Sequence, residues 1–196
     1  MQEQGTMSTI QFEAKLYTIG AWTILRLPER ASAQLPSRGM TMVAGTINGA
    51  PFKAVLEPDG RYGPGQNPSH WFRPDTELLD AASAQAGDTV HVALEPTKEW
   101  IEPDVPEDVQ QALAASPQAE ALWKDITPSA RWEWIRWIRA VKTPETRHKH
   151  IAVALDKLNK GMRRPCCFNR NLCSEPDVAH NWVLLDPRQT TEKSQV

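Results

Sequence analysis

One stretch of sequence decides how the first half of the chain can fold: MVAGTINGAPFKAVL, residues 42–56. Two apolar runs flank Asn48-Gly49, and both of these residues tolerate the positive φ angles of a type I′ turn. Asn-Gly between apolar runs is a strong short-range signal of a β-hairpin. The stretch therefore predicts two antiparallel strands joined by a two-residue turn.

Strand patterns continue on both sides of this hairpin. Residues 10–16 alternate apolar and polar side chains with the period of two that a strand with one buried face requires. Residues 22–27 and 89–94 are two further strand candidates, and a short helix is predicted over 76–84. Several short strands with turn residues between them favour a small barrel, since a closed barrel leaves no strand edge exposed.

The composition changes after Trp100. An acidic linker that contains Pro103 and ends before Pro106 comes first, and about four helices are predicted beyond it. Three of these helices begin with a hydroxyl N-cap and a proline at the first helical position, at Ser116-Pro117, Thr127-Pro128 and Thr143-Pro144. Because the connections between the helices are short, we expect a compact unit of antiparallel neighbours.

These patterns predict an α+β protein built from two modules. The first is a small closed β-barrel of about six strands with one short helix, and the second is a compact unit of about four helices. The expected divisions of the chain are a disordered tail over 1–8, the barrel over 9–97, the acidic proline-containing linker over 98–105, the helical module over 106–164 and a cysteine-containing tail over 165–196.

The composition is that of an ordinary folded protein. Apolar residues make up 40 % of the 196 residues and charged residues 23 %, which argues against a disordered or fibrous chain. No run of about 18 apolar residues occurs, so we expect no membrane span. The first residues, MQEQG, lack the features of a secretory signal, and three cysteines cannot all pair within one chain. We therefore expect a cytoplasmic protein, as a monomer or a dimer.

Two sets of residues resemble known protein families. The first set resembles a small bacterial β-barrel domain of unknown function: Arg38-Gly39, VAGTINGAPF at 43–52, LEPDG at 56–60 and GDTV at 87–90. The second set resembles the helical domain of the bacteriocin-protection, YdeI or OmpD-associated family: Trp137-Ile138, Glu145-Thr146-Arg147 and Ile151. That family often carries this barrel ahead of its helical domain. The resemblance implies the two-module architecture and a link to bacteriocin resistance or envelope stress, but it brings no reaction and no catalytic residues.

A glycine-rich loop in the barrel module, GRYGPGQ at 60–66, does not connect a strand to a helix as a phosphate-binding loop does. We interpret it as a mobile or lid-like loop. Ligands often bind at the mouths of small barrels, and we place a site in a groove between the two modules. The candidate ligand- or anion-binding residues are Arg38, His70, Trp71, Arg73, Arg139 and Arg147.

The segment 131–164 is strongly basic, with ten Lys or Arg against three Asp or Glu. Its tryptophans Trp132, Trp134 and Trp137 lie among the basic residues, a combination that suits phosphate contacts with base stacking. The alternative, which we favour, is that the tryptophans are core residues and that the acidic segment 101–130 neutralises the basic side chains. For Arg147 in particular, the alternative to an anion clamp is a structural ion pair.

The tail carries three thiols and an imidazole within fifteen residues: Cys166, Cys167, Cys173 and His180. One hypothesis is a metal site, with zinc or copper(I) as the ion, although adjacent cysteines do not form a standard zinc knuckle. A second is a redox sensor whose thiols are acidified by nearby arginines. The bland alternative is that the cysteines pack as small apolar side chains.

The expected function follows from what the sequence contains and what it lacks. It has no nucleophile elbow, no zinc-protease helix, no Walker sequence and no dinucleotide fingerprint. We expect a non-enzymatic accessory or stress-protection protein that binds a small molecule or a protein partner, with no cofactor unless the cysteine tail holds a metal. The alternatives are nucleic-acid or anion binding through the basic helices, and a thiol or metal sensor in the tail.

Overall fold

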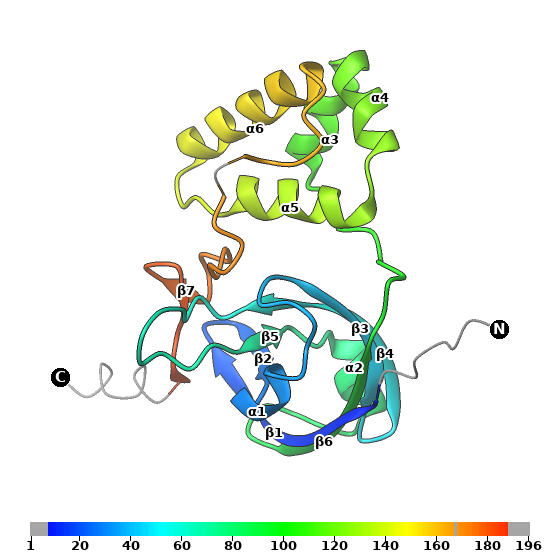
Figure 1. Ribbon diagram of the computed structural model, residues 1–196, viewed down its shortest axis with the longest axis vertical. Coiled ribbons are helices and arrows are strands. Elements are labelled where there is room, and N and C mark those ends of the chain that lie inside the picture. The colour runs from blue at the N-terminus through cyan, green and yellow to red at the C-terminus, as the bar shows by residue number, and fades with distance from the viewer. Residues whose placement is uncertain (1–7, 167, 188–196) are drawn as a thin grey trace. The chain divides into compact units, whose positions relative to one another are not determined.

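The computed structural model describes residues 8–166 and 168–187, and these residues form two compact units (Figure 1). The barrel unit contains residues 8–99 together with 170–173 and 177–187 from the end of the described chain. The helical unit contains residues 100–166, 168–169 and 174–176. Each unit is described by itself below.

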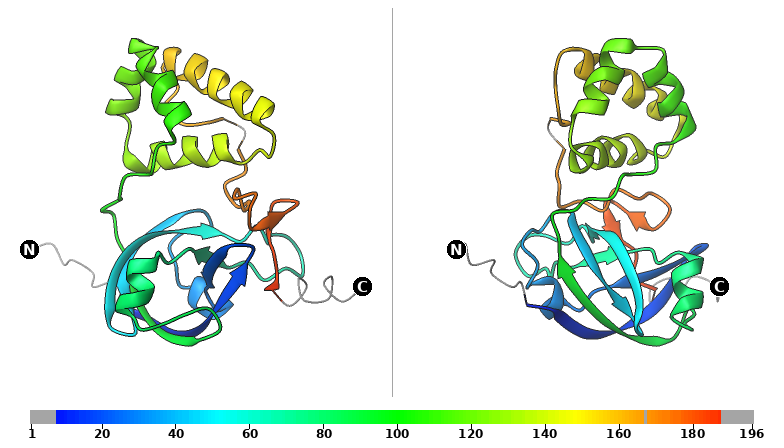
Figure 2. Two further views of the ribbon diagram at one scale, coloured as in Figure 1. Left: turned by 180° about the vertical axis from the view of Figure 1, so that it is seen from behind. Right: turned by 90° about the vertical axis from the view of Figure 1, so that its right-hand side faces the viewer.

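The barrel unit is a closed, fully antiparallel barrel of six strands in the order β1-β2-β5-β4-β3-β6, with β6 pairing back onto β1. The strands are β1 (Ile10–Ile19), β2 (Trp22–Arg26), β3 (Thr41–Ile47), β4 (Ala50–Pro58), β5 (His70–Phe72) and β6 (Thr89–Pro96). Figure 2 shows the same barrel from behind and from the side. The predicted α+β class and the closed N-terminal barrel are confirmed.

The hairpin predicted from residues 42–56 is the pair β3–β4. Ile47 lies opposite Ala50, and the two turn residues have positive φ angles, 47° at Asn48 and 86° at Gly49. The Asn48 side chain also accepts a hydrogen bond from the backbone N–H of His91, 2.9 Å away, on the neighbouring strand β6. The turn therefore ties three strands together, and this explains why a short local signal specifies so much of the barrel.

Two elements of the barrel unit escaped the sequence patterns. Strand β5 has only three residues, too few to show a period, and it pairs with both β2 and β4. A second short helix, α1 (Glu29–Ser32), accompanies the predicted one, which is α2 (Thr76–Ala81). The barrel thus has two short helices where one was expected.

The barrel wall is apolar on both faces over β2 and β5. Leu25 and Phe72 point into the main core of the barrel, whereas their neighbours Ile24 and Trp71 belong to a separate apolar cluster. This alternation follows from the period of two along a strand. The second cluster, here called the outer cluster, is completed by Cys173, Val178, Ala179 and Leu184 from the C-terminal segment. That segment forms the hairpin of β7 (Ala179–His180) and β8 (Val183–Leu184).

The helical unit contains the four predicted helices: α3 (Glu107–Ala114), α4 (Pro117–Asp125), α5 (Pro128–Arg139) and α6 (Pro144–Asn159). Two of the three predicted hydroxyl caps are present, because Thr127 and Thr143 accept from the N–H groups three residues later, at 3.3 and 3.2 Å. The Ser116 side chain makes no capping hydrogen bond, and its hydroxyl donates to Asn159 Oδ1 at 3.1 Å instead. The unit has its own apolar core around the fully buried Trp134. None of the described helices combines the length and the apolar character needed to cross a membrane.

Candidate functional site

Two arginines share one buried carboxylate at the end of β4. Asp59 has a side chain only 1 % exposed, and its Oδ2 accepts from Arg26 Nε (3.0 Å) and Nη2 (2.8 Å) and from Arg61 Nη1 (3.0 Å). Its Oδ1 accepts from the backbone N–H of Arg61 at 3.0 Å. Among the residues that the structure describes, two guanidinium charges therefore face one carboxylate charge. We call Arg26 and Arg61 the arginine pair.

The short strand β5 brings these residues together. In the barrel register, Trp71 of β5 lies opposite Arg26 of β2 on one side and Glu57 of β4 on the other. The backbone N–H of Asp59 donates to the carbonyl of Ser69, just before β5, at 2.9 Å. Arg26 and Asp59 are distant in sequence, and only the order β2-β5-β4 places them in contact.

The C-terminal hairpin docks onto the same place through backbone contacts. The N–H of Leu184 donates to the carbonyl of Asp59 at 2.8 Å, and Arg61 Nη2 donates to the carbonyl of Leu184 at 3.2 Å. Gly60 has a φ of +81°, and a Cβ built on it would lie 1.9 Å from the carbonyl oxygen of Trp182. Residue 60 must therefore be glycine for the hairpin to approach this closely.

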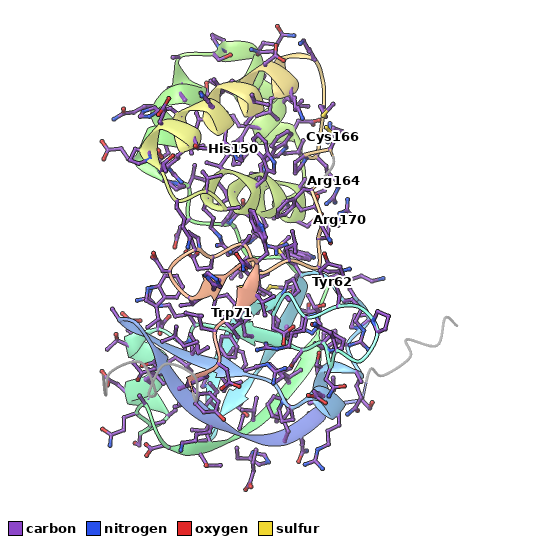
Figure 3. The ribbon with its side chains drawn as sticks, turned by 90° about the vertical axis from the view of Figure 1, so that its left-hand side faces the viewer. Tyr62, Trp71, His150, Arg164, Cys166 and Arg170 are labelled. Carbon is purple, nitrogen blue, oxygen red and sulfur yellow. The ribbon has the colours of Figure 1, made fainter. Side chains whose placement is uncertain are left out.

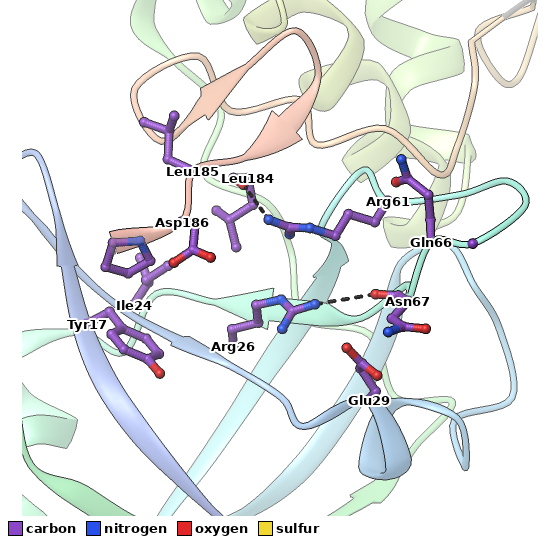
Figure 4. Close-up of a pocket in the computed structure, with 12 residues that line it drawn as sticks. Tyr17, Ile24, Arg26, Glu29, Arg61, Gln66, Asn67, Leu184, Leu185 and Asp186 are labelled. Carbon is purple, nitrogen blue, oxygen red and sulfur yellow. Dashed lines mark hydrogen bonds between the residues drawn. The ribbon is translucent and has the colours of Figure 1, made fainter. Parts of the chain in front are cut away.

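Two cavities border the arginine pair. The first has a volume of about 350 Å³ and lies between β2, the 60–66 loop and the segment after β8 (Figure 4). Its charged and polar lining residues are Tyr17, Arg26, Glu29, Arg61, Gln66, Asn67 and Asp186. The second has a volume of about 250 Å³, and its lining includes Arg38, Asp59, Arg61, Tyr62, Gln66 and His70. Arg61 and Gln66 line both cavities, so the glycine-rich loop separates them.

Arg38, a candidate from the sequence, is exposed and lines the second cavity. Within the part of the chain that the structure describes, its guanidinium makes no hydrogen bond and no ion pair. Arg61 lines the same cavity but is held by Asp59 and Leu184. The second cavity thus combines one fixed arginine with one free one.

His70 lies beside Arg38 and is fully occupied by hydrogen bonds. It is 1 % exposed, with Nε2 2.9 Å from the carbonyl oxygen of Gly39 and Nδ1 2.7 Å from Ser32 Oγ. Burial lowers the pKa of His70, opposed by the Gly39 hydrogen bond and reinforced by the charge of Arg38. The neutral ring donates from Nε2, because a carbonyl can only accept, and accepts at Nδ1 from the serine hydroxyl. Through these two hydrogen bonds, His70 holds α1 and the loop at Gly39 against β5.

The other two barrel candidates have packing contacts. Trp71 is 2 % exposed in the outer cluster, and its indole N–H donates to the carbonyl of Pro58 at 3.2 Å. Arg73 is exposed, with its guanidinium carbon 4.3 Å from the centre of the Trp22 ring. Tyr62, which the sequence did not single out, is exposed on the glycine-rich loop and lines the second cavity (Figure 3).

The two candidates in the helical unit are both ion-paired there. Arg147 forms a two-pronged pair with Asp108, through Nε at 2.7 Å and Nη2 at 2.9 Å. The Arg147 hydrogen bonds lower the pKa of the Asp108 carboxyl, and the same contact raises the pKa of Arg147. Arg139 lies 3.3 Å from a carboxylate oxygen of Glu175. For Arg147 the geometry supports the structural ion pair over the anion clamp.

Most of the basic segment 131–164 is neutralised in the same way. The further pairs are Arg131–Glu102, Lys149–Glu145, Lys160–Asp156, Arg163–Asp125 and Arg164–Glu133. Arg136 is fully buried, and its Nε lies 3.1 Å from Ser174 Oγ. Trp134 is a core residue, while the Trp132 indole N–H donates to the carbonyl of Ile101. These contacts favour the structural interpretation of the basic segment over nucleic-acid binding.

The candidate metal or redox residues of the tail lie in different surroundings. Cys166 is exposed on the segment after α6, with Lys157 Nζ 2.9 Å from its sulfur (Figure 3). Cys173 is 1 % exposed in the outer cluster, as the packing alternative requires, and His180 is exposed on β7. Cys167 lies outside the described residues. Within those residues, no three His, Cys, Asp or Glu side chains are grouped as metal ligands. The metal and redox hypotheses stay predictions.

The centre of the site was not predicted from the sequence. Asp59 appears there only within the LEPDG stretch at 56–60, and Arg26, Glu29 and Asp186 are not among the candidate residues. The one usable signal is that Asp59 and Arg61 lie beside and within the glycine-rich loop at 60–66. Nothing local to Arg26 or Asp186 indicates that they come near this loop.

Each of the two units is similar to a known protein family. An antiparallel barrel domain followed by a four-helix domain is the class of protein that the fold defines. Residues 10–94 match a domain of unknown function, DUF1905, and residues 102–161 match the family described as Bacteriocin-protection, YdeI or OmpD-Associated. The two matches follow one another along the chain, and the resemblance seen in the sequence is confirmed. No curated protein matches the chain in sequence.

Proposed function

We propose that the barrel unit binds a small molecule through a negatively charged oxygen group, a carboxylate or a phosphate, in the second cavity. One observation carries the proposal: Arg26 and Arg61 share the single carboxylate of Asp59, while the free Arg38 lines the same cavity as Arg61. The cavity thus offers an excess of positive charge in a recess, the condition under which an oxyanion gains most from a guanidinium.

The fixed geometry of Arg61 also favours binding. Its Nη1 donates to Asp59 and its Nη2 to the carbonyl of Leu184, so its orientation is set before a ligand arrives. A preorganised group loses less conformational entropy on binding than a free one. Arg38 supplies the second, mobile contact, and the exposed Tyr62 offers a flat apolar surface beside it.

The same contacts suggest a role in binding without turnover. His70 uses both ring nitrogens in hydrogen bonds, and Asp59 accepts four, so neither group is free to move a proton. We propose a cytoplasmic accessory protein that holds or senses its ligand. Support for a protective role comes from the family that residues 102–161 match, whose description includes bacteriocin protection.

The test is a titration followed by amide chemical shifts, with inorganic phosphate and with acetate as the probes. We expect shifts at residues that line the second cavity, and we expect Arg38→Met to weaken binding about tenfold, the loss of one charge-assisted contact. Arg30→Met is the matched control, because Arg30 is also exposed but lines neither cavity. No shifts with either probe, or equal weakening by both variants, would refute the proposal.

A further inference from the structure

We infer that the ligand of the second cavity carries its negatively charged group on a planar aromatic ring, and that this ring lies against Tyr62. The ligand class is therefore an aryl carboxylate or an aryl phosphate, as a free small molecule. This inference rests on the proposed function, because it assumes the oxyanion site and adds the part of the ligand that the arginines do not contact.

The position of Tyr62 is the observation that carries this inference. Tyr62 is 49 % exposed, more than any other large apolar residue that the structure describes, and it lines the second cavity. An aromatic ring prefers offset or edge contacts with a second ring, and such a pair gains more than the burial of its area alone. The open surface of Tyr62 in this cavity is therefore a place where a ring of the ligand can stack.

Two prolines extend the apolar part of the lining. Pro58 lines the second cavity from the end of β4, and Pro68 lines it from the segment before β5. Proline rings lose no side-chain entropy when they are covered. The rings of Tyr62, Pro58 and Pro68 thus border one cavity of about 250 Å³, whose size suits a single small ring with its acid group.

Several polar side chains of the lining are already engaged within the protein. Ser69 Oγ donates to the carbonyl of Leu27 at 2.6 Å, and His70 uses both ring nitrogens in hydrogen bonds. The four hydrogen bonds that Asp59 accepts are described above. A ligand rich in hydroxyl groups would bury them here with few partners, which costs free energy. The lining therefore favours an apolar ring as the body of the ligand.

The backbone on both sides of Tyr62 is held by hydrogen bonds. The N–H of Arg61 donates to Asp59 Oδ1 at 3.0 Å, and the N–H of Gln66 donates to the carbonyl of Gly63 at 3.2 Å. Tyr62 follows Arg61 directly in the chain, and both line the same cavity. A ligand whose acid group is attached directly to its ring can contact both side chains without ordering a flexible linker, which lowers the entropy lost on binding.

The experiment compares matched pairs of probes by isothermal titration calorimetry. Benzoate is paired with cyclohexanecarboxylate, and phenyl phosphate with cyclohexyl phosphate, so the two pairs also distinguish carboxylate from phosphate. The saturated ring has a similar size but neither a flat face nor π electrons. In at least one pair we expect the aromatic probe to bind about fivefold more tightly than its saturated partner, the value of one aromatic contact.

The variants locate the ring. Tyr62→Phe should keep the preference for the aromatic probe, whereas Tyr62→Leu, which keeps an apolar side chain, should abolish it. Trp182→Leu is the matched control, because Trp182 is 43 % exposed in the barrel unit but lines neither cavity, and it should change neither affinity. Arg38→Met should weaken both probes of a pair equally, since it removes a contact to the acid group that they share.

The outcomes separate this inference from the proposed function. Equal binding of the aromatic and saturated probes overturns the ring and leaves the oxyanion site standing. A preference that persists in Tyr62→Leu, or that is also lost in Trp182→Leu, shows that Tyr62 does not hold the ring and overturns the inference as well. Failure of every probe to bind, inorganic phosphate and acetate included, overturns the oxyanion site and the ring with it.

Discussion

The two units use their arginines in opposite ways. In the helical unit, five arginines are each ion-paired with a different carboxylate, for example Arg147 with Asp108 and Arg163 with Asp125. In the barrel unit, Arg26 and Arg61 share one carboxylate, and Arg38 has none among the described residues. The segment that is strongly basic in sequence, 131–164, is thus the one whose arginines are more fully neutralised by ion pairs. Local composition is a poor guide to an anion site, because pairing decides how much charge is left.

The largest effect should come from the carboxylate that two arginines share. Asp59→Asn keeps the shape of the side chain but leaves two partly buried guanidinium groups uncompensated, and we expect the free energy of unfolding to fall by about 3 kcal/mol. Asp108→Asn is the matched change in the helical unit, where the carboxylate side chain is 41 % exposed against 1 % for Asp59, and it should cost less than about 1 kcal/mol. Urea denaturation of both variants measures the difference, and equal losses would remove the contrast between the units.

A smaller loss is expected where the C-terminal hairpin meets the barrel. Gly60→Ala places a Cβ against the carbonyl of Trp182 and forces a left-handed φ on alanine, so it should lower the free energy of unfolding by about 2 kcal/mol. Gly49→Ala has a similar φ, +86°, with nothing within 4 Å, and should cost only about 1 kcal/mol. If the two variants lower the free energy of unfolding equally, the C-terminal hairpin contributes little to the stability of the barrel.

The buried His70 should make the barrel unit sensitive to pH. Burial holds the pKa of His70 below its ordinary value of 6.5, so below that pH the unfolded chain takes up a proton that the folded chain does not. The free energy of unfolding should therefore be constant above pH 6.5 as far as His70 is concerned and fall as the pH drops towards the lowered pKa. In His70→Gln this part of the pH dependence should disappear. A slope unchanged by the substitution would contradict the prediction.

The smallest effect concerns the ion pair of the helical unit. Arg147 lowers the pKa of Asp108 below its ordinary value of 3.8, so the pair stabilises the fold above that pH, and the stabilisation is lost as the pH falls through the lowered pKa. Because both side chains are partly exposed, Arg147→Met should cost only about 0.5 kcal/mol at neutral pH. Carbon-detected titration of Asp108 is the measurement, and the pKa should rise in the variant.

Much of the fold could be predicted because its signals are local. The turn at Asn48-Gly49, the alternation over 10–16 and the Thr-Pro starts of α5 and α6 each depend on residues close in sequence. The three-residue strand β5 and the two-residue strands β7 and β8 could not be found this way. They are too short to show a period and exist only because neighbouring strands complete their hydrogen bonds.

The candidate site was predicted only in part. Arg38 and His70 were named from the sequence and do lie together at the second cavity, but His70 is engaged in packing hydrogen bonds. Asp59, which organises the site, was not named, since nothing in LEPDG at 56–60 shows that Arg26 will reach it. The outer-cluster position of Trp71 and Cys173 likewise depends on where the C-terminal hairpin docks.

By itself, the sequence determined the two modules, the β3–β4 hairpin, the helix starts and the family resemblance, because turn angles, caps and side-chain periods act over a few residues. The tertiary structure alone decided which charges meet. Whether an arginine is neutralised by a carboxylate or left to bind a ligand depends on through-space distances of a few ångströms between residues far apart in the chain, such as Arg26, Asp59 and Leu184. The Coulomb energy depends on that distance and on the local burial, and the order of the residues in the sequence specifies neither.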